Sequence, residues 1–597
     1  MKKLFYLTVL GFAMLKNTQA QNFNPNLANL LQTKLDSLVT AFQGNTKGVS
    51  IGIYCPGQGY WTGVSGISHQ GVNITPDMKY GIASNSKMYI AVTLLRMAED
   101  QLLNLDSPIS TWLDPIPNVD ATATVRQLLN HTSGIDDPFF STSLLDSINA
   151  HPTHVYTPQE IFTYVGAPLF PVGTSYSYSN INYILSGMIA EEISGLSMAQ
   201  LVRNYILTPL SLTSTFYDYI EPEITPLAHR WHSQLDYSDT SRISLNSAGG
   251  PAGAIFSNAD DMVHWYHSIM DGQLLNENSF AQLSDFISFG ALGNYGLGIQ
   301  RTTFFNRETW GHGGSTHGYK SRTVYDPCSK FVVCGLSNDD WSAIDGITLL
   351  MYKALVDNLP DCSATITGES IICQGQQNLT YTVPEITNAT SYSWTFPNGF
   401  VGLSATNSIT VDASMASLSG DISVKGINMY GEGATSKLSI TVNPVPATAN
   451  IILNGDQIHS DAPNGNQWYD QNGILVGEIN QDFNYTLAGS YYVIVNLLGC
   501  NSSQSNTINT FNLGIVEGKV AANFKLYPNP TSDNVTLALN GNEKTSNYRV
   551  YNILNQEVMK GDFSQTTILE FKNLNVGVYT VKVENGNNSF VQRLVKR

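Results

Sequence analysis

The sequence has few charged residues and no basic cluster. Only 13% of its 597 residues are charged, against about 25% in an average soluble protein. Acidic residues outnumber basic ones by 47 to 30, which gives a formal net charge of −17. This balance argues against nucleic acid or an anionic membrane surface as the partner.

Long apolar runs are also missing. The run at residues 4–15 is too short to span a bilayer, and no later stretch is longer, so no transmembrane segment is expected. Lys2-Lys3 precede this run and Thr18-Gln19-Ala20 follow it. Together they predict a secretory signal peptide over residues 1–20, and therefore an exported mature protein.

Cysteines are too few for a disulfide-rich scaffold, and none has the spacing of a metal site or a redox C-x-x-C. Export permits disulfides, but six cysteines allow 15 connectivities. Cys362 and Cys373 lie on either side of a predicted domain boundary, and we expect them to pair. The six are Cys55, Cys328, Cys334, Cys362, Cys373 and Cys500.

One S-x-x-K motif stands directly before an apolar, helix-forming run. Ser84 and Lys87 form the only such motif in the chain, and the run extends from Met88 to Met97. At the start of a helix this spacing puts both side chains on one face, so the amine can reach the hydroxyl. The unpaired N–H groups of the first turn also favour negative charge there. An isolated match is common by chance, but the pattern can build a serine nucleophile.

Two further motifs follow at long spacing. Tyr178-Ser179-Asn180 lies 94 residues after Ser84, and His312-Gly313-Gly314 lies another 134 residues on. In order and spacing the three motifs resemble the S-x-x-K, Y-x-N and H/K-x-G elements of the serine β-lactamase and D-alanyl-D-alanine carboxypeptidase family. Tyr527-Pro528-Asn529 also matches Y-x-N, but we interpret it as structural.

Flanking segments extend the resemblance over residues 25–358. They are Val125–Gly134, which contains His-Thr-Ser-Gly, Ala248–Asp260 and Tyr295–Gly298. The resemblance implies an α/β fold with an antiparallel sheet flanked by helices, plus a mostly helical subdomain. Helical periodicity over residues 26–43, a hairpin pattern over 48–63 and a closing helix over 342–357 agree with it. His131 is expected to support the fold rather than the chemistry.

Three small all-β domains are predicted after the hydrolase-like region of residues 22–360. Alternating apolar and polar residues indicate strands over 364–445 and 446–512, which resemble PKD-like and immunoglobulin-like modules. Residues 524–597 contain Tyr-Pro-Asn-Pro-Thr and Gly-Val-Tyr-Thr-Val-Lys-Val, and resemble the C-terminal sorting domain of the type IX secretion system. That resemblance implies the type IX machinery as a partner, and a location outside the cell or at its surface, reached through the periplasm.

The family resemblance implies a role for each motif residue. Ser84 would be the nucleophile. Lys87 would either be the base itself or favour a phenolate on Tyr178, and the sequence leaves both open. Asn180 would hydrogen-bond the acylated part of the substrate, and His312 would complete the polar network from the opposite wall.

The same resemblance places the backbone N–H groups of Ser84 and Ser315 in the oxyanion hole, with Gly313, Gly314 and Ser315 beside the substrate. Gly313 stands where many family members carry a Thr whose hydroxyl binds a substrate carboxylate. Its absence predicts slow β-lactam hydrolysis, although Arg301 or Arg322 could supply charge instead.

These inferences predict a secreted serine hydrolase that cleaves amide or ester bonds of a small peptide or ester through an acyl-enzyme. Neither a metal nor an organic cofactor is expected. Two alternatives stay open at this point. One is a true β-lactamase, and the other is a catalytically inactive surface binding protein or adhesin on the same fold.

Overall fold

The computed structural model describes residues 23–232, 234–288, 294–362, 364–510, 524–539, 545–585 and 588–597. The predicted signal peptide lies outside these residues. The chain divides into two compact units, residues 1–445 and 446–597. The first contains the hydrolase-like region and one β-sandwich, and the second contains only β-sheets in its described residues.

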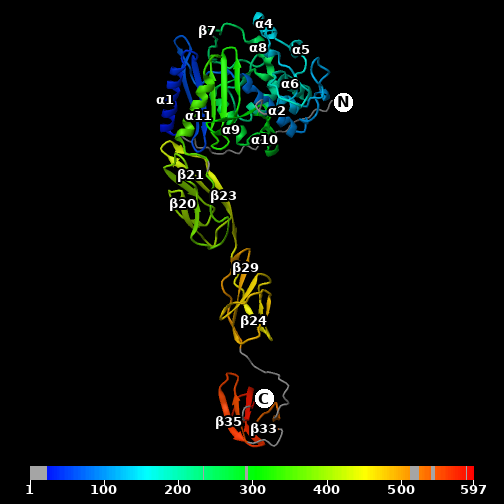
Figure 1. Cartoon of the computed structure of the whole chain (residues 1–597), viewed down its shortest axis with the longest axis vertical. Helices are drawn as coiled ribbons and strands as arrows, with labels where there is room; N and C mark the ends of the chain where they lie inside the picture. Colours follow the sequence, from blue (N-terminus) through cyan, green and yellow to red (C-terminus); the bar gives the residue numbers. More distant parts are fainter. Residues whose placement is uncertain are drawn as a thin grey trace. The chain divides into compact units, whose positions relative to one another are not determined.

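An antiparallel sheet, ten-stranded in the described residues, forms the middle of the hydrolase-like region (Figure 1). Its strand order is β3-β2-β1-β15-β14-β12-β11-β10-β9, and β13 pairs with β14. The predicted hairpin of residues 48–63 is present as β1 and β2. The strands are β1 Gly48–Cys55, β2 Gly59–His69, β3 Val72–Asn73, β9 Ile287–Ser288, β10 Asn294–Tyr295, β11 Gln300–Phe304, β12 Arg307–Gly311, β13 Gly313–Thr316, β14 Tyr319–Tyr325 and β15 Val332–Ser337.

Helices cover both faces of this sheet. Helices α1 (Pro25–Ala41) and α11 (Ile344–Asn358) pack on one face, and α9 (Ala259–Met270) packs on the other. Val49, Ile51 and Ile53 of β1 are fully buried against α1 and α11, as alternation along a strand requires. Gly52 faces α9, where a Cβ would lie 2.3 Å from the Ala259 carbonyl oxygen, so only glycine permits this close packing.

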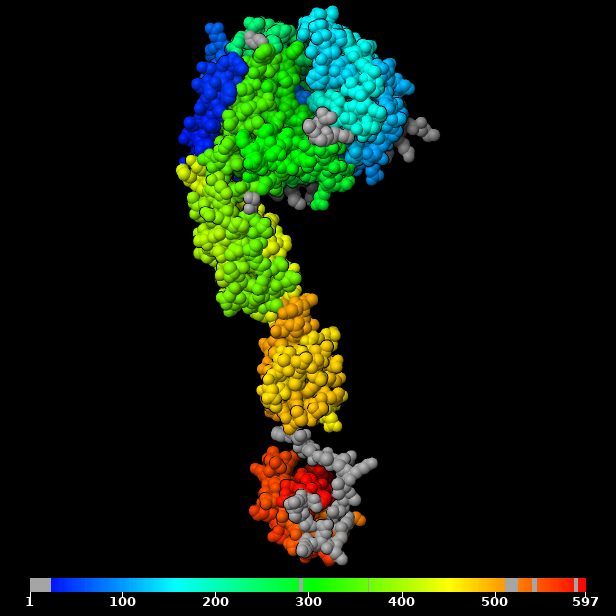
Figure 2. Space-filling view, in the orientation of Figure 1, coloured from blue at the N-terminus to red at the C-terminus, as the bar shows by residue number. Residues whose placement is uncertain are grey.

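The mostly helical subdomain surrounds α2, which is buried along nearly its whole length. In the space-filling view the cyan part of this subdomain packs directly against the green, sheet-bearing part (Figure 2). Its helices are α2 Ser86–Glu99, α3 Val125–Leu129, α4 Thr142–Ala150, α5 Pro158–Phe162, α6 Ile181–Ser194, α7 Met198–Val202, α8 Ile243–Gly249 and α10 Glu277–Leu283. The sheet and this subdomain confirm the expected fold class.

Charged and covalent contacts hold the segment that leads from α11 to the β-sandwich of the first unit. Arg307 contacts Asp326 at 2.8 Å and Asp361 at 2.6 Å. These contacts bring the end of β14 beside the chain that leaves α11, and Cys328 there forms a disulfide with Cys362. The expected Cys362–Cys373 pair is therefore wrong, because the hairpin turn after β14, distant in sequence, lies next to Cys362.

This sandwich has two sheets with the order β16-β23-β21-β18, including β22 on β21, and β17-β20-β19. Ile409, Val411, Ile422 and Val424 alternate with polar residues and form part of its core. The strands are β16 Ile371–Cys373, β17 Leu379–Thr382, β18 Ser391–Thr395, β19 Phe400–Val401, β20 Ser408–Ala413, β21 Gly420–Asn428, β22 Gly431–Glu432 and β23 Ser436–Asn443.

The second unit contains two separate hydrophobic cores. One surrounds the fully buried Trp468, and the other contains Val535, Val550 and Val581. Asn529 binds the backbone of Arg593 and Val595, which agrees with a structural role for the second Y-x-N match. The strands are β24 Ile451–Asn454, β25 Gln457–Ser460, β26 Asn466–Asp470, β27 Gly473–Ile474, β28 Asp482–Asn484, β29 Gly489–Leu497, β30 Cys500–Asn501, β31 Ile508–Thr510, β32 Phe524–Tyr527, β33 Asn534–Leu539, β34 Ser546–Tyr551, β35 Glu557–Phe563, β36 Thr566–Glu570, β37 Gly577–Asn585 and β38 Asn588–Lys596.

Candidate active site

Ser84 lies on a short 3-10 turn, η1 (Ala83–Asn85), that continues directly into α2. The turn is fixed from both sides. Ala83 before the serine adopts a left-handed conformation with φ of +48°, which is uncommon for a residue with a side chain. Asn85 after it is buried and binds Ser321 at 2.8 Å. Ser84 itself stays partly exposed.

Strand β13 lies against this turn because Gly314 has no side chain. A Cβ at Gly314 would lie 2.4 Å from the Ile82 carbonyl oxygen and 2.5 Å from the Ser321 hydroxyl. The last residue of the His-Gly-Gly motif is therefore required for β13 to reach the nucleophile turn. Ser315, the next residue, lines the same cleft as Ser84.

Lys87 is fully buried, and three oxygens surround its amine. The Nζ atom lies 3.1 Å from Ser84 Oγ, 2.7 Å from Asn180 Oδ1 and 2.9 Å from the Ala252 carbonyl oxygen. Burial lowers the pKa of Lys87 to about 7, while the charge of Asp137 acts in the opposite direction.

This set of partners suits both forms of the amine, since an ammonium could donate to all three oxygens. A neutral amine has two N–H groups and one lone pair, and two of the three oxygens around Lys87 are carbonyl oxygens that can only accept. The two N–H groups can bind these oxygens, which leaves the lone pair for the hydrogen of the Ser84 hydroxyl. The geometry therefore equips Lys87 to take a proton from Ser84.

Asp137 fixes the orientation of Asn180. Its Oδ2 accepts hydrogen bonds from the Asn180 backbone N–H at 2.9 Å and from Asn180 Nδ2 at 2.8 Å, so that Oδ1 of Asn180 faces Lys87. Burial raises the pKa of Asp137, and the Asn180 N–H donors partly offset this. The sequence analysis missed this residue. One sequence signal was available. Asp137 stands directly before Pro138, shortly after the His-Thr-Ser-Gly segment, and Asp followed by Pro is typical of the start of a helix.

Tyr178 lies beside the lysine, but its ring rather than its hydroxyl faces the amine. The Lys87 Nζ atom is 4.8 Å from the centre of the ring. The hydroxyl is buried and forms no well-aligned hydrogen bond in the part of the chain that the structure describes, although it lies near the Ser84 side chain. Burial raises the pKa of Tyr178 well above its usual value, with a smaller opposing effect from Ser84. A phenolate is therefore strongly disfavoured.

His312 lies behind the cleft instead of on its wall. It is buried in the segment between β12 and β13, where Nε2 lies 2.9 Å from the Tyr295 hydroxyl and Nδ1 lies 2.5 Å from the Gly313 carbonyl oxygen. Burial, assisted by the charge of Lys87, lowers the pKa of His312 to about 3, so the ring is neutral. Its ring centre is 6.1 Å from that of Tyr178.

His131 is also buried, and burial keeps its pKa well below the usual range. Its Nδ1 lies 3.2 Å from the Ser179 N–H and 3.1 Å from Asn182 Nδ2. It therefore holds the segment that carries the Y-x-N motif, as a supporting residue would.

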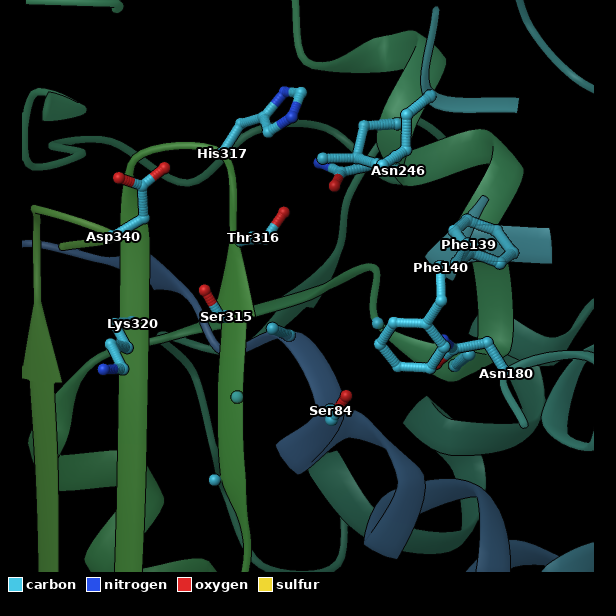
Figure 3. Close-up of a pocket in the computed structure, with 18 of the residues that line it drawn as sticks. Ser84, Phe139, Phe140, Asn180, Asn246, Ser315, Thr316, His317, Lys320 and Asp340 are labelled. Atoms are coloured by element: carbon cyan, nitrogen blue, oxygen red, sulfur yellow. The ribbon is translucent and has the colours of Figure 1, made fainter. Parts of the chain in front are cut away.

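A cleft of about 620 Å³ opens over Ser84 (Figure 3). Ser315, Thr316 and Lys320 come from the sheet side, and Asn180, Phe139 and Phe140 come from the opposite side. The full lining is Ala83, Ser84, Phe139, Phe140, Leu145, Tyr178, Asn180, Leu245, Asn246, Gly249, Ala252, Gly253, Gly313, Gly314, Ser315, Thr316, His317, Lys320, Asp340, Trp341 and Asp345. The lining therefore includes several residues that follow Ser315 in the sequence, up to Asp345.

Charge on the cleft wall comes from carboxylates and one lysine. Lys320 pairs with Asp345 at 2.9 Å, and Asp340 contacts His232 at 2.9 Å. Neither Arg301 nor Arg322 is among the described lining residues. Arg301 contacts Asn294, and Arg322 packs over Phe304.

Residues 27–357, more than half of the chain, match the sequence profile of the β-lactamase family. The chain belongs to the β-lactamase family. Other parts match a PKD-like domain, over residues 359–440, and the secretion system C-terminal sorting domain, over residues 525–597.

The curated relatives of this chain have different names. The chain is 27% identical to a D-aminopeptidase of Brucella suis over 47% of its own length and 54% of the relative. It is 26% identical to Protein flp of Staphylococcus aureus over 40% of its length and 49% of that protein. The chain therefore spans about half the length of the curated relatives it matches.

A solved structure of the same fold is the D-amino acid amidase of Ochrobactrum anthropi SV3 in complex with D-phenylalanine. It aligns with 56% of this chain and with all of the amidase, at 25% identity and a TM-score of 0.50. In the described residues, no group of three His, Cys, Asp or Glu side chains is arranged to hold a metal ion, and no helix is long and apolar enough to cross a membrane.

The pKa of Lys87 predicts how the reactivity of Ser84 depends on pH. Because that pKa is lowered to about 7, the neutral amine becomes the main form as the pH rises from 6 to 8. The rate at which a fluorophosphonate labels Ser84 should therefore increase with a midpoint near that pKa. Lys87→Ala should slow labelling by about 100-fold or more and remove the inflection. A flat profile in the wild type would contradict the assignment of Lys87 as the base.

Asp137→Asn tests the positioning role of Asp137. Because the negative charge raises the pKa of Lys87, removing it should move the labelling midpoint to lower pH. Weaker orientation of Asn180 should also slow labelling about tenfold, the effect of losing one charge-assisted hydrogen bond. Asp136→Asn is the matched control, since Asp136 binds the Gly166 N–H instead. An unchanged midpoint in Asp137→Asn would refute the electrostatic link.

Proposed function

We propose that this protein is a secreted serine hydrolase that cleaves amide or ester bonds through an acyl-enzyme, with D-amino-acid peptides, amides or esters as its substrate class. The observation that carries the proposal is the 3.1 Å contact between Ser84 Oγ and the buried amine of Lys87. A serine hydroxyl needs such a base, because it is a weak nucleophile at its ordinary pKa.

In the first step, Ser84 Oγ attacks the substrate carbonyl and its proton passes to Nζ of Lys87. The negative charge that develops on the carbonyl oxygen is stabilised by the backbone N–H groups of Ser84 and Ser315, which line the same cleft. Lys87 is then an ammonium held by Asn180 and by the Ala252 carbonyl oxygen.

The intermediate collapses when the leaving amine or alcohol receives the proton that Lys87 holds. This leaves the acyl group on Ser84 Oγ. A water molecule then repeats the sequence, with Lys87 taking its proton, and releases the acid product. His312 acts indirectly, since its neutral ring supports Tyr295 and the start of β13.

The substrate class is supported by the relatives and by the charge of the cleft. A D-aminopeptidase and a D-amino acid amidase are among the similar proteins. Gly313 offers no hydroxyl to a substrate carboxylate, and a Cβ there would lie 3.5 Å from Arg322 Nη1 and 3.8 Å from Asp345 Oδ1. A cleft with two carboxylates and a paired lysine favours substrates without a free carboxylate beside the reacting bond.

Export is supported by the C-terminal sorting domain that residues 525–597 match. We infer that the type IX secretion machinery recognises this domain and moves the protein across the outer membrane, after which it is released or held at the cell surface.

Ser84→Ala should abolish turnover and leave the fold intact, because it removes one oxygen from a partly exposed position.

The wild type should hydrolyse a short-chain p-nitrophenyl ester and a D-amino-acid p-nitroanilide faster than a chromogenic cephalosporin. A peptide ending in D-Ala-D-Ala should be cleaved no faster than its amide. Rapid cephalosporin turnover would instead indicate a true β-lactamase, and failure of a fluorophosphonate to label wild type would indicate an inactive binding protein.

Deletion of residues 524–597 should leave kcat/KM unchanged and stop export at the periplasm. The reason is that the described cleft residues all precede Leu359, whereas the deleted segment has its own hydrophobic core. Fractionation of cells that carry the truncated chain measures this. Finding the truncated protein at the cell surface would rule out the sorting role of the segment.

A further inference from the structure

Two large aromatic side chains at the cleft are left unusually open to solvent. Phe140 is 76% exposed and Trp341 is 62% exposed, and both line the cleft that contains Ser84. Apolar surface at a catalytic cleft gains free energy when a ligand covers it, so two such rings on one cleft form a candidate binding position.

Phe140 is held in place by the carboxylate that orients the catalytic amide. It ends the short 3-10 helix η3 (Pro138–Phe140), which Asp137 caps by accepting the Phe139 N–H at 3.1 Å. The other oxygen of Asp137 binds Asn180. The ring of Phe140 projects into the cleft from the side opposite Ser315 (Figure 3). Its position is therefore tied to that of Asn180.

Trp341 comes from the sheet side of the cleft, in the segment between β15 and α11. Its backbone N–H donates to Asp339 Oδ1 at 2.9 Å, and its ring packs edge-on against His232 with 6.2 Å between ring centres. Leu145 and Leu245 add apolar lining. The nearby charges of Lys320 and Asp345 offset each other in a 2.9 Å pair.

We propose that Phe140 and Trp341 form an apolar subsite that binds a large, flat or apolar side chain of the substrate from both sides of the cleft. This inference rests on the proposed hydrolase function and specifies its substrate: an amide or ester whose acyl part carries an aromatic or bulky aliphatic side chain. Of the charged side chains on the described lining, Lys320 and Asp345 pair with each other, and Asp340 contacts His232.

The first experiment compares kcat/KM of the full secreted chain on the p-nitroanilides of D-phenylalanine and D-alanine. The ratio of the two values should favour D-phenylalanine in the wild type and fall about tenfold in Phe140→Ala and in Trp341→Ala, since each variant removes one of the two exposed rings of the proposed subsite. Phe305→Ala is the matched control, because Phe305 is a half-exposed ring outside the cleft lining, and it should keep the wild-type ratio. An unchanged ratio in both cleft variants would overturn the inference.

The second experiment does not need turnover. In Ser84→Ala, titration with D-phenylalanine amide should change the tryptophan fluorescence, with a dissociation constant about tenfold below that for D-alanine amide. Trp341→Phe in the same background should lose this signal. If D-phenylalanine amide binds more tightly than D-alanine amide but the wild type hydrolyses neither substrate, the proposed function is refuted and the proposal of the subsite stands. Hydrolysis without any aromatic preference in rate or binding would keep the function and refute the subsite.

Discussion

Burying the amine of Lys87 next to Ser84 sets the requirements for the elements around it. An amine removed from water must find hydrogen-bond partners, or it costs several kcal/mol. Here the partners come from two distant segments, Asn180 before α6 and Ala252 in the turn after α8, both of which supply carbonyl oxygens. The helical subdomain must therefore pack around α2 before the amine of Lys87 is buried and hydrogen-bonded beside Ser84.

The same burial favours one of the two candidate bases over the other. Desolvation disfavours the charged form of every ionisable group, so it lowers the pKa of a lysine and raises that of a tyrosine. Lys87 moves to about 7, whereas Tyr178 moves away from the physiological range. One physical effect therefore makes Lys87 a usable base and keeps Tyr178 as a protonated phenol. Asp137 moderates the effect, since its charge keeps the pKa of Lys87 from falling further.

The sequence allowed the fold and the central residues to be predicted because the relevant patterns are local. S-x-x-K and Y-x-N each place two side chains on one short segment, so the contact of Lys87 with Ser84 follows from a local pattern, whereas the contact of Lys87 with Asn180 depends on the packing of two distant segments. His312 was harder to place. The motif locates it beside β13, but only the packing of Tyr295 shows that its ring points behind the cleft.

Residues whose importance depends on tertiary contacts are not identified by any local sequence motif. Asp137 and Trp341 belong to no motif, and their significance depends on segments 43 and more residues away. The disulfide partner of Cys362 was missed for the same reason, because the turn that carries Cys328 is brought there by the ion pairs of Arg307.

Under the proposed function, the contacts of Asp137 would connect substrate binding with catalysis. One carboxylate caps the turn that presents Phe140 and also fixes the amide that faces Lys87. A substrate side chain that packs on Phe140 therefore restrains the short segment whose other end sets the position of Asn180. Because proton transfer requires the amine and the hydroxyl in one geometry, restraint of that segment favours the reactive arrangement when the cleft is filled. Binding energy from a side chain remote from the reacting bond can in this way contribute to the rate and not only to affinity.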